Sequence, residues 1–408
     1  YVIMAYLDGN EKESSASNKV WATDYMKIHL DRPEGGISPA GGKEEQREYT
    51  YTPDDVSVGD VDGDGEFEYI VKWFPTNAAD NSHRRFTGNT LLDCYKLDGT
   101  KLWRIDLGCN IRSGNHYTQF MVYDFDGDGK AELICKTAPG TIDGKGNPVL
   151  MNDDKVSDDF RNKDGIIMSG PEYLTVFKAM TRAEINTIEY NPPRTIRKND
   201  KSSNGWGDDY GNRSERYLAG VAYLDGIKPS GIFVRGYYTA SYVWAVDFDG
   251  SKLTERWLHV SDKSGANSIY GQGSHSLSIA DLDSDGFDEI IIGSGAVDHD
   301  GSFMHSTGAG HGDALHVGDF VLENEGLEIY MPHEDTKNKW STTLRDGKTG
   351  KILYSQPMNG KDNGRGLIAN VSSKFPGSEY WSQYDSNVMN SGQIAGSKRP
   401  SVNFRIYW

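Results

Sequence analysis

Short runs of alternating apolar and polar residues dominate the chain, and glycine-containing turns separate them. Val56 and Val58 precede one acidic loop, for example, and Ile70 and Val71 follow it. A period of two predicts strands that bury one face, and few stretches have the period of a long helix. The 47 glycines, 23 tyrosines and 9 tryptophans favour the same interpretation, because glycine serves turns and aromatic residues suit strands. We therefore predict an all-β fold.

Two kinds of predicted hairpin alternate along the chain. In the first kind, apolar strands flank an acidic loop, and weaker copies occur at 218–234, 314–331 and 366–381. The second kind has an Asp-Gly or Thr-Gly turn, as in CYKLDGTKLWRIDL, which is a strong hairpin signal. One hairpin of each kind gives a four-stranded unit, and such units in series predict propeller blades, with an array of β-sandwiches as the alternative. Insertions at 136–170 and 187–215 are expected to gather on one face and build a site.

Three acidic loops share one spacing of carboxylates. The glutamate of each loop comes eight residues after its first aspartate. Alternate side chains of a curled segment point to one side, which suits a hard cation that takes six to eight oxygen ligands. An EF-hand needs its glutamate at position 12, where the first loop has Val71, so that interpretation fails. Acidic surface turns without metal remain the alternative for a single copy, but three copies favour metal binding. The predicted ligands are Asp60, Asp62, Asp64 and Glu68; Asp124, Asp126, Asp128 and Glu132; and Asp281, Asp283, Asp285 and Glu289.

The charge balance restricts the possible partners. Lysine and arginine number 43 against 60 aspartates and glutamates, a formal net charge of −17, which argues against a nucleic-acid partner. Three cysteines, an odd number, imply no complete disulfide framework. No apolar run approaches the roughly 20 residues of a membrane span. The first ten residues lack the regions of a signal peptide, and NFRIYW at 403–408 continues a strand pattern, so we expect a chain cut from a longer protein at both ends.

Long motifs follow one another in order from about residue 50 to 408, among them SVGDVDGDGEFE, HYTQFMVYDFDGDGKAELICKTAPGT, WGDDYGNR, GQGSHSLSIADLDSDGFDEII and GHGDALHVGD. Together they closely resemble the rhamnogalacturonan lyases of polysaccharide lyase family 11. The resemblance implies an eight-bladed β-propeller that holds several calcium ions. Residues 51–408 would be its propeller region, truncated at the C-terminal end, and residues 1–50 would be the tail of a preceding β domain with an entry strand. The acidic loops would then be structural calcium clips.

The same resemblance implies cleavage of the rhamnogalacturonan I backbone of pectin by β-elimination at galacturonate. Removing the C5 proton builds negative charge beside a carboxylate, so the site needs a metal ion or an arginine there, and a base for the proton. We expect a calcium-dependent lyase that acts on a pectic polysaccharide as a monomer and is secreted, periplasmic or at the cell surface. A non-catalytic calcium-dependent propeller that binds pectin or a protein partner is the alternative.

Candidate site residues outside the clips stand at the starts of predicted hairpins. His275, His311 and Asp313, with His316 nearby, form a group of the kind that can hold a divalent ion, although a lone histidine more often packs in a core or lies on the surface. The resemblance implies that His275 and His311 are ligands of a calcium ion in a cleft. Arg365 lies between two glycines, where its guanidinium could meet a substrate carboxylate with two parallel hydrogen bonds. We expect it to be catalytic, with a solvated turn residue as the alternative.

Four further positions are assigned to substrate. Trp206 and Tyr210 in NGWGDDYGN could stack on a sugar or could form a packed aromatic loop. By the resemblance, Asp54 and Phe74 face substrate at positions where relatives usually carry Asn and Asp, which leaves subsite preference open. The lysine that resembles the base of this family has no counterpart before Trp408.

Overall fold

The computed structural model describes residues 2–7, 10–16, 25–41, 45–197 and 203–402. Strands and their connecting loops make up nearly all of this part of the chain, together with one short 3-10 turn, η1 (Ser203–Gly205). The all-β prediction is therefore confirmed. No helix among the described residues is long and apolar enough to cross a membrane. The strand pattern predicted at 403–408 lies outside the described residues.

Within the described ranges, six four-stranded antiparallel sheets follow one another, each a simple meander. The first contains β5 (Tyr51–Gly59), β6 (Glu68–Pro75), β7 (Leu91–Tyr95) and β8 (Lys101–Asp106). The second contains β9 (Phe120–Tyr123), β10 (Glu132–Thr137), β11 (Tyr173–Lys178) and β12 (Glu184–Glu189). The third contains β13 (Tyr217–Ala222), β14 (Ser230–Arg235), β15 (Ser241–Phe248) and β16 (Leu253–Ser261).

The last three sheets have the same order. The fourth contains β17 (Gly273–Ala280), β18 (Glu289–Gly293), β19 (Gly295–Val297) and β20 (Phe303–Ser306). The fifth contains β21 (His316–Gly318), β22 (Glu328–Pro332), β23 (Trp340–Asp346) and β24 (Ile352–Pro357). The sixth contains β25 (Gly366–Ala369), β26 (Glu379–Ser382), β27 (Val388–Asn390) and β28 (Gln393–Gly396). Each sheet thus joins two hairpins, as the sequence predicted, although the second hairpins of the second and sixth sheets lack an Asp-Gly or Thr-Gly turn.

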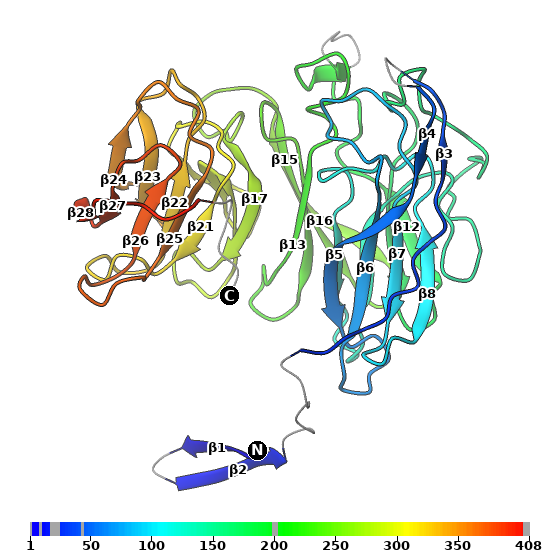
Figure 1. The fold of residues 1–408 in the computed structure, drawn as a ribbon, viewed down its shortest axis with the longest axis horizontal. Helices are drawn as coiled ribbons and strands as arrows, with labels where there is room; N and C mark the ends of the chain where they lie inside the picture. Colours follow the sequence, from blue (N-terminus) through cyan, green and yellow to red (C-terminus); the bar gives the residue numbers. More distant parts are fainter. Residues whose placement is uncertain (1, 8–9, 17–24, 42–44, 198–202, 403–408) are drawn as a thin grey trace.

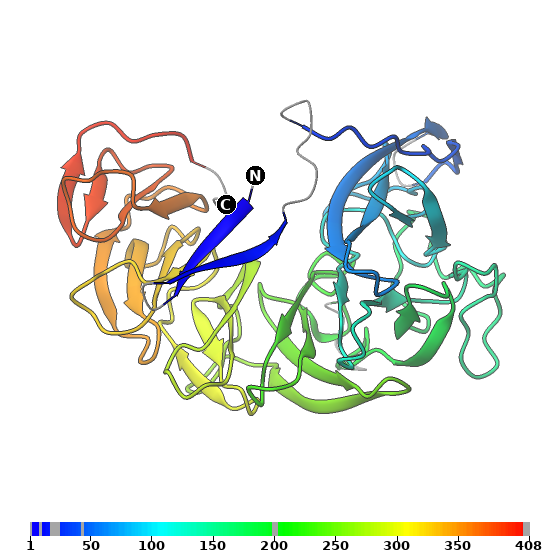
Figure 2. The same cartoon turned by 90° about the horizontal axis from the view of Figure 1, so that it is seen from below.

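The six sheets lie side by side in chain order around an open arc (Figure 2). Two small hairpins precede them. The pair β1 (Val2–Leu7) and β2 (Asn10–Ala16) lies apart from the sheets, and the pair β3 (Gly36–Ser38) and β4 (Arg47–Tyr49) lies beside the first sheet (Figure 1). Within a sheet, the acidic loop follows the first strand. The first strand therefore begins at the opposite end of the sheet. The long connections from β10 to β11 and from β12 to β13 lie at that same end.

A buried glutamate begins the second strand of five sheets. These residues are Glu68, Glu132, Glu289, Glu328 and Glu379. Each accepts a hydrogen bond through one carboxylate oxygen from a backbone N–H at the start of its own loop, at 2.6–3.1 Å. This bond closes the hairpin around its turn. In the two weaker copies with a glutamate, the position eight residues before it, which is an aspartate in the three acidic loops, is Phe320 or Val371.

Apolar residues fill the spaces between neighbouring sheets. Ile70 and Leu133 are completely buried in one cluster that joins the first and second sheets, and the other interfaces contain similar clusters. Full burial of such a side chain contributes about 1.5–3 kcal/mol. Cys94 and Cys135 belong to the first cluster as free thiols, and burial raises the pKa of Cys135 to about 12.

A buried ionic network joins the second and third sheets where the two long insertions end. The carboxylate of Glu172 contacts Lys136 at 2.7 Å and both Arg194 and Arg235 at 2.8 Å. Glu215 pairs with the same two arginines, at 3.3 Å for Arg235. All five side chains are at most 7% exposed. Since removing one partner from such a network costs about 3–5 kcal/mol, these contacts fix the insertions against the sheets.

Candidate active site and metal sites

A cleft of about 520 Å³ lies at the end of the sheets where their first strands begin. One part of its wall is apolar, and the rest carries carboxylates, amides and histidines from the first to the fifth sheet and their connections. Its lining residues are Asp55, Asn115, His116, Gln119, Leu218, Ala219, His275, Ser276, Leu277 and Asp313. The cleft is therefore open to a polar ligand from solvent.

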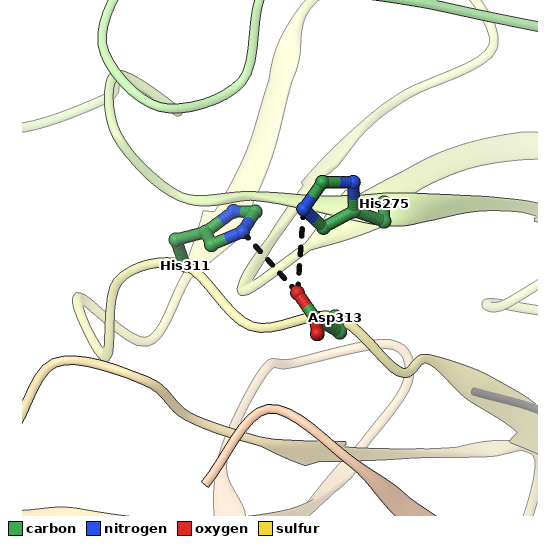
Figure 3. A group of neighbouring side chains, drawn as sticks. All are labelled: His275, His311 and Asp313. Carbon is green, nitrogen blue, oxygen red and sulfur yellow. Dashed lines mark ion pairs between the residues drawn. The ribbon is translucent and has the colours of Figure 1, made fainter. Parts of the chain in front are cut away.

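The structure brings the predicted histidine group together in this cleft. His275 comes from β17, while His311 and Asp313 precede β21 (Figure 3). One carboxylate oxygen of Asp313 lies 3.3 Å from Nε2 of His275 and 3.8 Å from Nε2 of His311. Candidate ligand atoms of all three residues lie within 4.8 Å of one another.

The orientation of His311 fits a metal ligand. Its Nδ1 lies 2.7 Å from the carbonyl oxygen of Gly273, which can only accept, so Nδ1 carries the proton. Its Nε2 is then unprotonated and faces the group, and this buried atom has no hydrogen-bond partner among the described residues. Burial lowers the pKa of His311 to about 3, so the imidazole stays neutral at physiological pH. A neutral imidazole with one fixed nitrogen and one unpartnered nitrogen is the form that binds metal.

Glu334 is a member of this group that the sequence did not single out. It follows β22, its backbone N–H donates to the carbonyl of His311 at 3.0 Å, and its carboxylate lies 3.9 Å from Nε2 of that histidine. Burial, together with a hydrogen bond to Asp313, raises the pKa of Glu334 to about 9. Two carboxylates hold a shared proton when no cation lies between them. Two imidazoles and two carboxylates form a donor set that a divalent ion would occupy.

His316 lies outside the group, because its Nε2 contacts the carbonyl oxygen of Gly366 at 3.1 Å. The predicted arginine lies closer. Arg365 is exposed on the turn before β25, and its charge favours the ionised form of Glu334. The carbonyl of Gly364 accepts the backbone N–H of Asp313 at 3.1 Å, and a Cβ there would lie 2.8 Å from both carboxylates of the group. A glycine at 364 therefore lets the Arg365 turn approach the acidic group.

The predicted substrate residues of the first sheet surround a buried lysine. A bulge in β5 contains Asp54 and Asp55, and the ammonium of Lys72 pairs with both, at 3.1 Å for Asp54. The ring of Phe74 lies 5.8 Å from the same ammonium. Bulges often redirect side chains beside active sites. Here the bulge directs Asp55, which the sequence did not single out, into the cleft wall.

The stacking prediction for Trp206 does not fit the structure. Its side chain is completely buried, its Nε1 donates to the carbonyl of Arg194 at 2.9 Å, and the guanidinium of Arg235 lies 5.3 Å from its ring. The ring therefore covers the ionic network, and the packed aromatic loop is the better description. Tyr210 is half-buried, and the guanidinium of Arg84 lies 5.2 Å from its ring, so one of its faces is already in use.

The second and third acidic loops have the features of calcium sites, with Lys178 no closer than 4.0 Å to Asp128 and His299 at 3.6 Å from Asp285. Glu289 has one buried carboxylate oxygen with no hydrogen-bond partner among the described residues. Burial first, and neighbouring aspartates second, raise the pKa of Glu132 and of Glu289 to about 8. In the second loop, ligand atoms of Asp124, Asp126 and Glu132 lie within 4.8 Å of one another. In the third loop, the same holds for one group of Asp281, Asp283 and Asp285 and for a second group of Asp285, Glu289 and His299. A hard cation would supply the missing partner of Glu289 and offset the charge.

Two other loops already contain a cationic or amide partner. In the first loop, the ammonium of Lys96 lies 2.6 Å from Asp62, 3.2 Å from Asp64 and 3.7 Å from Glu68. In the fifth sheet, the amide of Asn324 donates to the second oxygen of Glu328 at 2.7 Å. The same frame therefore contains a lysine ammonium in the first loop and a side-chain amide in the fifth sheet.

Comparison with known proteins gives the family of the chain. The family model for the C-terminal domain of rhamnogalacturonan lyase family 11 matches residues 25–408. Rhamnogalacturonan endolyase YesW of Bacillus subtilis (strain 168) is 50% identical over 408 residues, which are 100% of this chain and 63% of that protein. Rhamnogalacturonan exolyase YesX of the same organism is 48% identical over 417 aligned residues, covering 100% of this chain and 66% of that protein.

Solved structures give the same result. The crystal structure of YesW has a TM-score of 0.88 at 50% identity, and that of a Bacillus licheniformis rhamnogalacturonan lyase of family PL11 has 0.89 at 49% identity. Each alignment covers 98% of this chain and 66% of the other chain. The chain thus spans slightly less than two thirds of the length of these relatives. On the family model and on these relatives, the chain belongs to rhamnogalacturonan lyase family 11.

Proposed function

We propose that the protein is a calcium-dependent lyase that cleaves the rhamnogalacturonan I backbone of pectin by β-elimination at galacturonate. The names of both relatives, one an endolyase and one an exolyase, support the reaction class. The observation that carries the proposal is the group of His275, His311, Asp313 and Glu334 in an open cleft with Arg365 beside it. An adhesion module or a purely structural protein has no need for such a group.

The reaction needs positive charge on an otherwise acidic protein. A calcium ion held by the two imidazoles and two carboxylates would neutralise the galacturonate carboxylate, which makes the C5 proton easier to remove. Arg365 is exposed at the rim of the group and can donate two parallel hydrogen bonds to the same carboxylate. The apolar wall at Leu218 and Leu277 would pack against a sugar ring and orient it.

The proposal extends to the architecture and setting of the protein. The arc of six sheets would be part of an eight-bladed propeller, with residues 51–408 in the propeller region and residues 1–50 as the tail of a preceding β domain with an entry strand. The second and third acidic loops would be calcium clips that hold their hairpins. Asp54 and Phe74 would contact substrate beside the cleft. The protein would act on pectic polysaccharide as a monomer that is secreted, periplasmic or at the cell surface.

The test is incubation of the complete gene product with rhamnogalacturonan I in calcium, while the ultraviolet absorbance of an unsaturated uronate is followed. Two variants form a matched pair, because each removes candidate metal ligands. His311→Ala should lose turnover at nearly unchanged melting temperature. The double variant Asp126→Ala with Asp128→Ala should lose stability while the folded fraction keeps its activity. Absence of unsaturated product from the parent would refute the lyase proposal and favour a binding module.

A further inference from the structure

Tyr237 lies behind the histidine group, and its side chain is completely buried. It follows β14, and its backbone carbonyl accepts the N–H of Gly273 at 3.1 Å. A Cβ on Gly273 would collide with the Tyr237 side chain, so this close approach requires glycine. The ring of Tyr237 stacks parallel to that of His311 at 5.6 Å between centroids. Backbone and ring contacts thus hold the hydroxyl at one place relative to both histidines.

The Tyr237 hydroxyl contacts two histidines from different walls of the cleft. It lies 3.0 Å from Nδ1 of His275 and 3.4 Å from Nδ1 of His116. Nε2 of His116 in turn lies 3.6 Å from a carboxylate oxygen of Asp80. The guanidinium of Arg216 lies 3.4 Å from the other oxygen of Asp80 and also hydrogen-bonds Tyr237. The chain of contacts therefore runs from His275 to a charged pair behind the cleft.

The partners fix the direction of each hydrogen bond. Although burial acts in the opposite direction, hydrogen bonds from Ser82 and the charge of Arg216 lower the pKa of Asp80 to about 2, and its ionised carboxylate, 3.6 Å from Nε2 of His116, favours the proton on that nitrogen by charge. Nδ1 of His116 is then an acceptor, and the Tyr237 hydroxyl donates to it. Besides the lone pair that accepts from Arg216, the hydroxyl oxygen retains one lone pair for Nδ1–H of His275. His275 is thereby left with an unprotonated Nε2, which points toward Asp313.

The neighbouring tyrosine has the opposite relation to His275. The hydroxyl of Tyr238 lies 3.0 Å from Nε2, the nitrogen that an ion would need. Tyr238 therefore competes with an ion at this nitrogen, whereas Tyr237 supports the ion from behind. The two adjacent residues carry the same side chain and differ in the nitrogen that each contacts.

We propose that Tyr237 is the positioning residue of the cleft ion: its hydroxyl fixes the Nδ1–H tautomer of His275 and holds Nε2 toward the ion, with His116 and Asp80 fixing the direction of the bond. This inference rests on the proposed function only in assuming that the histidine group binds a divalent ion. Partners of this kind behind a ligating histidine typically contribute 10- to 100-fold in metal affinity. His311 needs no such residue, since the carbonyl of Gly273 does the same for it.

The test measures ion binding directly. Calcium-depleted protein is titrated with Tb³⁺ as a calcium substitute, and the luminescence sensitised by nearby tyrosines is followed; the signal that His311→Ala removes defines the cleft site. Tyr237→Phe should weaken this site by about 10- to 100-fold and leave the loop sites unchanged. Tyr238→Phe is the matched control, because it also removes one hydroxyl, and should bind at least as tightly as the parent. Competition with calcium should give the same order of affinities.

The outcomes separate this inference from the proposed function. If His311→Ala removes no signal, the cleft holds no ion and both fail. If the site exists but Tyr237→Phe binds it like the parent, or Tyr238→Phe weakens it equally, only the positioning role fails. Melting temperatures in chelator show whether each variant folds. If Tyr237→Phe does not fold, His116→Phe serves instead, because it removes the histidine that accepts the hydrogen bond of the Tyr237 hydroxyl. The affinity of the cleft site for the ion should then fall at least about threefold. An affinity equal to that of the parent would overturn the inference.

Discussion

The glutamate of the third acidic loop offers the sharpest test of the calcium clips. In Glu289→Gln, the amide oxygen can still accept the N–H of Leu282, now at 2.6 Å from the carboxylate, so the hairpin closure is kept. The second oxygen, which has no hydrogen-bond partner in the described part of the chain, becomes an amide that cannot bind calcium. The variant should therefore fold and lose its response to calcium at this loop.

The expected size follows from binding linkage. One calcium site at a hundredfold excess of ion over Kd stabilises the folded state by about 2.7 kcal/mol. In a chain of this size, with an unfolding entropy of about 2.1 cal/mol/K per residue, that amount corresponds to roughly 3 °C in melting temperature. Without calcium, the effect of Glu289→Gln on stability has the opposite sign, because burial raises the pKa of Glu289 to about 8 and an ionised buried carboxylate destabilises the fold. At pH 8 in chelator, Glu289→Gln should melt at or above the parent.

Differential scanning calorimetry measures the melting temperatures of the parent and of Glu289→Gln, each in chelator and in a calcium series. Glu328→Gln is the matched control, since Glu328 occupies the same place in its hairpin but already receives the Asn324 amide at 2.7 Å. Its calcium response should equal that of the parent. A Glu289→Gln protein that gains as much from calcium as the parent would show that the third loop is not a clip, and so would an equal loss in the control.

Three further predictions concern pH, the first loop and catalysis. In chelator, the raised pKa of Glu132 and Glu289, about 8 against an ordinary 4.5, contributes stability that is full below about pH 4.5 and is lost as the pH rises to 8, so melting temperature should fall between about pH 5 and 8. Calcium should flatten this fall, and parallel curves would contradict the assignment. Lys96→Ala should tighten calcium binding in the first loop, measured by calorimetric titration, because its ammonium competes for Asp62; unchanged affinity would mean that the lysine moves aside freely. In the complete gene product, Arg365→Lys should lower turnover at least about tenfold with folding intact, since a lysine loses the planar fork; full activity would remove Arg365 from the site.

Local spacing made the sheets predictable. The alternating hairpins needed only the period of two and the Asp-Gly turns, and the four-stranded sheets follow from them. The glutamate that begins a second strand persists in the weaker copies, where Glu328 and Glu379 follow a Gly-containing turn. That signal places the repeating frame at Phe320 and Val371, where the first aspartate of the turn has been replaced.

The site was predictable only in part, because it forms between sheets. His275 and His311 stood out as histidines at equivalent hairpin starts. Glu334 did not, since it lies in a polar stretch with other charged residues and only folding brings it to His311. The interior position of Trp206 could not be derived from a glycine-rich loop either, because it depends on the buried Arg235 that the ring covers. Burial against a distant residue has no signature in local sequence.

The buried network between the second and third sheets also bears on how such a chain can change over time. Glu172 serves three cations at once, so a single replacement of Lys136, Arg194 or Arg235 would alter its balance in a place that water does not reach. Substitutions there would survive only in compensating sets. The exposed turn at 145–148 of the first insertion carries no such constraint and is free to lengthen or diversify. Homologues should therefore differ more in this turn than in the network residues, which should covary, so that new loop contacts can evolve without loosening the sheets beneath.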